Sequence, residues 1–332
     1  MSIAKSVTSP VSNTKGKTVE YDSFAITDIP AAMDNMGWVM GPKLMRRWFS
    51  GKYWVMDKDT RVGDIKVADL PKEHKCTDVI TMKWALQYPQ VQKAMEELFL
   101  GWKSRAGIRE LVAHLLDLGW TPDTPVLDFK NENKPTDEIH VSAQVNYRSF
   151  GRAIDTIDDM YGAIGKGTLN IAVSGVAKKH LFYIEKVGFY IKDTYDFTLA
   201  DKTIATYSPS NFLGVWNKER CLNKTETTEF FGGEFWYVPG LSGPQLGSLS
   251  PVLLESKKKY AKQGFVAVYN QHFNAWREAR QVGCDFILLS DIAWFDVQNQ
   301  PGSIVNLFDC ISDYDEKDLK DKNNVCRDIL WK

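Results

Sequence analysis

The chain has 332 residues, of which 44% are hydrophobic and 12% aromatic, so it is long enough to bury a sizeable core. Its formal net charge of −1 and its pI near 6.5 argue against a broad basic surface for binding nucleic acid. The five cysteines are far apart and include no Cys-x-x-Cys pair, and this spacing excludes a zinc ribbon or a thioredoxin-type site.

The first segment, residues 1–24, is rich in Ser, Thr and Lys and is expected to be a disordered leader. It lacks the apolar centre of a signal peptide. No stretch of the chain approaches the roughly 18 consecutive apolar residues of a membrane span, so no transmembrane segment is expected. A protein of this kind that acts outside the cytoplasm must be carried there by a specialised machine.

Residues 25–120 are expected to form a helical domain. Its clearest helix has Ser104 as the N-cap and Gly119 as the stop signal, and the apolar residues between them follow the i, i+3, i+4, i+7 spacing. Residues 121–138 contain three prolines among polar residues and are expected to be a linker.

Residues 139–312 are expected to form a β-rich domain, followed by a charged C-terminal tail at 313–332. Apolar and polar residues alternate from Ile139 to Tyr147, which predicts a half-buried strand. Further strands are expected near 168–176, 180–192, 228–238, 264–270 and 284–297. The whole chain is therefore predicted to be an α+β protein, with a helical N-terminal part followed by a mainly antiparallel sheet or partly open β-barrel.

Two carboxylates and a phenol follow the longest of these strands, in the sequence Asp193-Thr194-Tyr195-Asp196-Phe197. Residues at odd spacing in a strand point to opposite faces, so Asp193 and Asp196 can act together only if the chain turns between them. Such a strand end can bind a metal ion or a phosphate. The alternative is a structural turn, capped by Asp193 with Tyr195 packed beneath it.

The Asp-x-Tyr-Asp-Phe motif resembles the catalytic signature of the colicin M group of bacterial toxins. The resemblance implies Mg²⁺-dependent cleavage of the phosphoester of the peptidoglycan precursor lipid II. Asp193, Tyr195 and Asp196 would be catalytic, with Asp193 and Asp196 as the metal ligands. The His-Arg pair that follows the second acid in that group is missing from residues 198–204, which leaves the general acid or base unassigned.

A longer, ordered set of motifs lies between residues 25 and 300. Its members are Ile29–Met33, Met45–Phe49, Asp193–Phe197, Leu213–Trp216 and Gly283–Asp291. The set resembles an uncharacterised family of Gram-negative bacterial proteins whose genes often lie beside type VI secretion genes. The resemblance implies an antibacterial protein that a secretion system delivers.

A second group of candidate site residues follows the expected strand at 264–270. His272 can supply the missing acid–base group, because its side chain titrates near neutrality. Arg277 can hold a phosphate with its forked guanidinium. The alternative is that Phe273 and Trp276 belong to the core, while His272 and Arg277 pair with surface acids.

The sequence thus leads to a hypothesis of an antibacterial effector that a type VI-like system exports from the bacterial cytoplasm without a signal peptide. Its β-rich part would cleave lipid II in the target-cell periplasm. Expected partners are a secretion-spike or chaperone protein and a cognate immunity protein. The alternative hypothesis is a non-catalytic structural or adaptor protein of the secretion apparatus, which binds its partner through the helical part.

Overall fold

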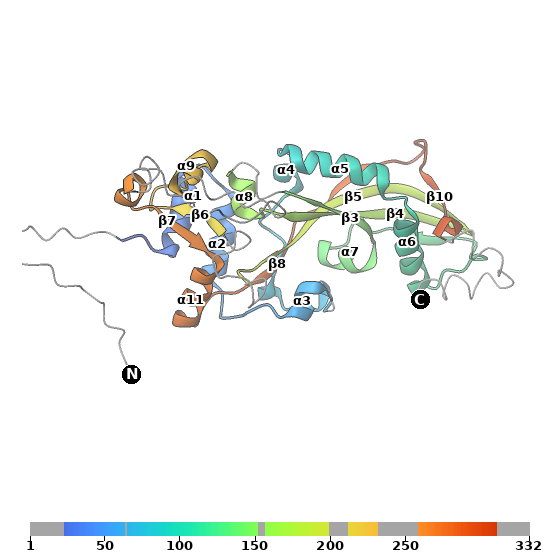
Figure 1. Ribbon diagram of the computed structural model, residues 1–332. Helices are drawn as coiled ribbons and strands as arrows, with labels where there is room; N and C mark the ends of the chain where they lie inside the picture. The colour runs from blue at the N-terminus through green and yellow to red at the C-terminus, as the bar shows by residue number, and fades with distance from the viewer. Residues whose placement is uncertain (1–22, 64, 152–156, 199–211, 232–257, 311–332) are drawn as a thin grey trace, which may run out of the picture.

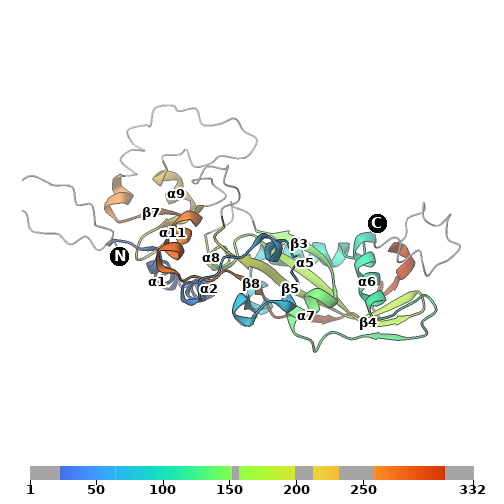
Figure 2. The ribbon, with the colours of Figure 1, turned by 90° about the horizontal axis from the view of Figure 1, so that it is seen from below.

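The computed structural model describes residues 23–63, 65–151, 157–198, 212–231 and 258–310. The expected leader, apart from its last two residues, and the charged tail at 313–332 lie outside these ranges. Figures 1 and 2 show an elongated molecule built around a long, curled sheet, with α1, α2 and α11 at one end and α6 at the other. The curled, mostly antiparallel sheet forms a half-barrel, so the predicted α+β class is confirmed.

Strand β5 (Leu181–Tyr195) organises the sheet. One of its edges pairs with β4 (Gly167–Lys178) in an antiparallel hairpin. Its other edge pairs in succession with β10 (Ile304–Asn306), β9 (Ala293–Asp296) and β8 (Phe286–Leu289). Strand β5 is therefore paired on both edges for most of its length, whereas residues 193–195 pair with β8 on one edge only.

The remaining strands complete the sheet on both sides. On the outer edge of β4, β3 (Gln144–Phe150) and β2 (Leu127–Phe129) pair in an antiparallel manner. At the opposite edge, β1 (Lys75–Cys76) runs parallel to β8. A separate pair joins β6 (Phe212–Trp216) to β7 (Val266–Tyr269), with its own small core.

The helices gather at the two ends and on the faces of the sheet. Those around the end that carries the site are α1 (Ile29–Asn35), α2 (Met40–Ser50), α3 (Lys58–Val62), α8 (Asp159–Ala163) and α11 (Asn270–Arg280). The others are α4 (Met82–Ala85), α5 (Pro89–Gly101), α6 (Arg105–Asp117), α7 (Thr136–Ser142) and α9 (Lys224–Phe230). No helix in the described ranges is long and apolar enough to cross a membrane.

Several local predictions can be compared with this arrangement. The Ser104 hydroxyl caps α6 as predicted, by accepting a hydrogen bond from the Gly107 amide at 3.3 Å. The strand predicted from Ile139 was wrong at its start, because Thr136–Ser142 form α7 and β3 begins at Gln144. The strand predicted near 228–238 was also wrong at its start, because Asn223 and Glu226 form a capping box that begins α9; residues 232–238 lie outside the described ranges.

One large hydrophobic cluster connects both halves of the chain. It extends from Ile29 to Cys310 and contains residues of the helical part and of the sheet. The segment 121–138, expected to be a linker, contributes β2 and the first turn of α7. The division into domains stays a prediction, since a shared core does not decide where one domain would end.

Candidate functional site

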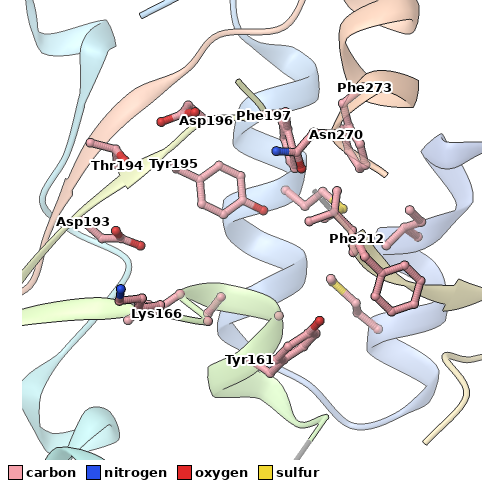
Figure 3. A pocket seen from close by; sticks show the side chains of 18 of the residues that line it. Tyr161, Lys166, Asp193, Thr194, Tyr195, Asp196, Phe197, Phe212, Asn270 and Phe273 are labelled. Carbon is pink, nitrogen blue, oxygen red and sulfur yellow. The ribbon is translucent and has the colours of Figure 1, made fainter. Parts of the chain in front are cut away.

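A cavity of about 460 Å³ lies at the end of β5 that carries the Asp-x-Tyr-Asp motif. Helices α1 and α2 supply apolar side chains to it, and the turn from α8 to β4 forms another wall. Strand β6 and the start of α11 complete the lining. We call this cavity the apolar pocket (Figure 3), because its lining is mainly apolar and includes Ile29, Met33, Met45, Phe212, Trp216 and Phe273.

The motif lies on an extended strand rather than on a turn. Strand β5 continues to Tyr195 because it pairs with β8, with Asp193 opposite Leu288 and Tyr195 opposite Phe286. Figure 3 shows Asp193 and Tyr195 on one side of the strand and Thr194 and Asp196 on the other. The alternation therefore separates the two carboxylates, as the period of a strand requires.

Asp193 is the carboxyl group of this motif that has no side-chain partner among the described residues. Within the described residues its side chain makes no ion pair and no side-chain hydrogen bond, although Lys166 reaches the same part of the pocket (Figure 3). Burial raises the pKa of Asp193 well above its ordinary value; the Thr194 backbone and the charge of Lys192 oppose this rise, and the charge of Asp196 adds to it. The environment therefore favours the uncharged, proton-donating form more than water does.

Asp196 has a different environment, because it is held by Arg61 of α3. The Arg61 Nε lies 3.4 Å from the Asp196 Oδ2, and the Thr198 amide donates to the Asp196 Oδ1 at 2.9 Å. Arg61 also donates to the Thr198 Oγ1 at 2.6 Å and to the Met56 carbonyl at 3.2 Å. Asp196 and not Asp193 thus fixes the backbone where β5 ends.

Tyr195 places a phenol in the wall of the apolar pocket. Its ring stacks on Phe286, with the ring centroids 5.0 Å apart, and its side chain is 8% exposed. Figure 3 shows the ring pointing into the pocket, and burial raises the pKa of its hydroxyl. A second phenol, that of Tyr161, lines the opposite wall, and burial raises its pKa to about 12. Both hydroxyls therefore stay protonated at neutral pH and can donate hydrogen bonds.

The other two predicted site residues lie outside this pocket. His272 is in the first turn of α11, where its Nδ1 accepts a hydrogen bond from the Tyr269 amide at 3.2 Å. Arg277 is 2% exposed, and its Nη1 lies 2.7 Å from the buried Asp285 Oδ1. The Arg277 guanidinium joins α11 to the start of β8, which is a structural contact. Residues Asn270 and Phe273 of the same helix line the pocket instead.

A second cavity, of about 420 Å³, shares Asp193 and Thr194 with the apolar pocket. We call it the polar recess. Besides the shared residues, its wall contains the charged side chains of Arg61 and Lys192 and the imidazole of His140. Asp193 therefore stands where a mainly apolar cavity meets a polar, positively charged one.

The described residues include no group of three or more His, Cys, Asp or Glu side chains that could hold a metal ion. Mg²⁺ needs less from the protein, because it commonly binds one or two carboxylates together with water and substrate phosphate. Asp196 is occupied by Arg61, so Asp193 is the carboxylate of the motif that is free to contact a cation. Of the two carboxylates of the motif, only Asp193 is therefore available to bind Mg²⁺.

Sequence reasoning missed the basic residues of the site. Arg61 donates a hydrogen bond to Thr198, which is 137 positions away in the sequence. No local sequence pattern predicts such a contact. Lys192 directly precedes the motif, and the strand period would have placed it beside Thr194. Tyr161 lies in α8 and Lys166 on the turn between α8 and β4, and neither position belongs to a recognisable motif.

Comparison with known proteins identifies the chain at the level of family. No curated protein and no solved structure matches it. One family model matches residues 24–303, a range that contains α1, the whole of β5 and every residue of the two cavities. The chain therefore belongs to the family of unknown function DUF6402.

Proposed function

We propose that this protein is an antibacterial effector, exported by a type VI-like secretion system, that cleaves a phosphoester in a lipid-linked envelope precursor such as lipid II. The observation that carries the proposal is the position of Asp193. It is an unpaired carboxyl group with a raised pKa, between an apolar pocket and a polar recess. Ligand sites commonly combine an apolar wall with a few placed polar groups.

The two cavities suit the two parts of such a substrate. The apolar pocket would take the first part of the lipid chain, against Met33, Met45 and Trp216. The polar recess would take the charged part. The scissile phosphorus–oxygen bond would then lie beside Asp193 and Tyr195, which point to the same side of β5 (Figure 3).

In hydrolysis, a water oxygen bonds to phosphorus, the bond from phosphorus to the leaving oxygen breaks, and the leaving oxygen takes up a proton. Asp193 in its uncharged form can donate that proton and later recover one from the attacking water. Tyr195 can orient a phosphate oxygen through its hydroxyl. If Mg²⁺ is bound, the Asp193 carboxylate would hold the ion in place of the proton, and the ion, rather than Asp193, would offset the charge that develops on the phosphate and the leaving oxygen.

The test is hydrolysis of a purified lipid-linked pyrophosphate precursor, with Asp193→Asn as the key variant. Asn keeps the size of the side chain but donates no proton, so kcat/KM should fall at least about 100-fold. Asp128→Asn is the matched control, since Asp128 is an exposed residue of β2 outside both cavities, and it should retain wild-type activity. Each reaction is run with Mg²⁺ and with a chelator.

A wild-type protein that releases no product with Mg²⁺ present would contradict the proposed activity. If Asp193→Asn is as active as the wild type, Asp193 is not the proton donor and another residue must have that role. In the first case the alternative gains support, namely a non-catalytic adaptor that binds a secretion-spike or chaperone protein. Co-purification of the chain with such a protein, with no toxicity in any compartment, is the result that the adaptor hypothesis predicts.

A further inference from the structure

The polar recess contains cations without enough anions to match them. Its wall is formed by α3, α7, β3, β4 and β5, and it shares Asp193 and Thr194 with the apolar pocket. Two of its lining side chains carry full positive charge, those of Arg61 and Lys192. The acids nearby are Asp193, whose pKa is raised by burial, and Asp196, which already forms an ion pair with Arg61.

Lys192 is the least compensated of these cations. Its side chain is half-buried, and within the described residues its ammonium group makes no ion pair and no hydrogen bond. Burial lowers the pKa of Lys192. The charge of the neighbouring Asp193 raises this pKa, but by less than burial lowers it. A cation that is partly removed from water and lacks a partner is stabilised when an anion arrives, because the anion restores the lost interaction.

Arg61 offers a second donor group to the same space. Its Nη2 donates to Thr198 and Met56, and its Nε lies 3.4 Å from the Asp196 Oδ2 without forming a hydrogen bond to any described residue. Its Nη1 also makes no hydrogen bond with any described residue. The two bonds of Nη2 and the ion pair with Asp196 fix the plane of the guanidinium. A fixed fork with a free donor can bind an oxyanion at little cost in side-chain entropy.

The remaining groups of the recess are neutral and polar. His140 is uncharged at neutral pH, because burial, assisted by the charge of Lys192, lowers its pKa to about 4. Its Nδ1 is hydrogen-bonded to the hydroxyl of the buried Tyr190 at 2.8 Å. Gln144 adds an amide to the wall, and Asn170 a second one that is 3% exposed. None of these groups would repel an anion.

From this arrangement we infer that the polar recess is an anion site, in which Lys192 and Arg61 bind the phosphate or pyrophosphate group of the ligand. The inference rests on the proposed function for its statement that this group belongs to the substrate. Binding itself does not require turnover, so the two claims can fail separately.

Calorimetric titration with inorganic pyrophosphate tests the site on the full chain. Lys192→Met should weaken binding at least about tenfold, since a charge-assisted hydrogen bond would be lost. Lys178→Met is the matched control, because Lys178 is an exposed lysine at the end of β4, outside the recess, and its affinity should stay within about twofold of the wild type.

Several results would overturn the inference. They are no binding of pyrophosphate by the wild type, equal affinity in Lys192→Met, or equal weakening by the Lys178→Met control, which would indicate non-specific attraction. Binding that depends on Lys192 in a protein that hydrolyses nothing would leave the anion site in place and reject the proposed reaction. Hydrolysis that is unchanged in Lys192→Met would instead support the proposed reaction and reject the assignment of Lys192 to the substrate phosphate.

Discussion

Two aspartates of one short motif have opposite environments in this protein. Asp196 lies against Arg61 and accepts a hydrogen bond from the Thr198 amide, so its charge is used to hold the end of a strand. Asp193 faces the cavities without an ion pair, and its charge is compensated only in part, by the Thr194 backbone and by Lys192. A carboxyl group that is buried without a partner destabilises a fold, and such groups are typical of functional sites.

This difference predicts an unusual effect of Asp193→Asn on stability. The pKa of Asp193 in the folded state lies above the unfolded value of 3.8, so its contribution to stability is present below that pH and is lost as the pH rises through the folded-state pKa. Asn cannot ionise. The variant should therefore melt at a higher temperature than the wild type at pH 7 to 8, and the gain should disappear near pH 4.

Thermal melts between pH 3.5 and 8 measure this gain directly, with Asp128→Asn as the exposed control that should show none. A lower melting temperature for Asp193→Asn at pH 7 would mean that the Asp193 carboxylate is stabilised in the fold. It would then be a structural residue, as the turn-capping alternative requires.

Among the secondary-structure elements, those with strong local signals were predictable and those set by distant partners were not. The helix α6 was evident from its cap at Ser104 and its apolar spacing. The end of β5 was misplaced, because its last residues are held in the strand by β8, about 95 positions away in the register. The ion pair of Asp196 with Arg61 depends on the same kind of distant contact.

The β4–β5 hairpin offers a test of packing at the element scale. Its register shifts between Ser174 and Gly175, and a Cβ atom on Gly175 would lie 2.1 Å from the Tyr183 carbonyl oxygen. Gly175→Ala should therefore force the two strands apart and lower the free energy of unfolding by about 1–3 kcal/mol.

Gly101→Ala provides the matched control for this substitution. Gly101 is the last residue of α5, and a Cβ atom there would meet nothing within 4 Å. Alanine is the better helix former, so Gly101→Ala should raise the free energy of unfolding by up to about 1 kcal/mol. Urea denaturation measures both changes, and equal effects of the two substitutions would show that the hairpin tolerates the added atom.

At the scale of the whole molecule, the sequence predicted the α+β class but could not show how its candidate residues assemble. The two-residue period of a strand was sufficient to predict that Asp193 and Asp196 point to opposite sides of the chain. The distance of His272 and Arg277 from the pocket depends instead on how α11 packs, and Arg277 is directed into the core by Asp285. Only the packed chain reveals that an arginine in a helix binds a buried acid and not a ligand.

The proposed function makes a prediction about the compartment in which the protein is toxic. Expression in the bacterial cytoplasm should be tolerated, because the lipid-linked precursor is attacked from the periplasm in this hypothesis. Fusion to a cleavable export signal should arrest growth or lyse the cells, and Asp193→Asn should abolish this effect. Growth curves and viable counts of both strains measure it, and equal toxicity in the cytoplasm would exclude an envelope target.

The parallel pairing of β1 with β8 has a consequence for the synthesis of this protein. Cys76 lies opposite Leu288, and Trp48 donates its indole N–H to Asp285 at 2.8 Å. At roughly 5–20 residues per second, a ribosome needs about 10–40 seconds to make the residues between Cys76 and its partner. Throughout that time the tryptophan-rich first helices are outside the ribosome with no strand to cover them. A holding chaperone that binds the nascent chain should therefore increase the yield of folded protein.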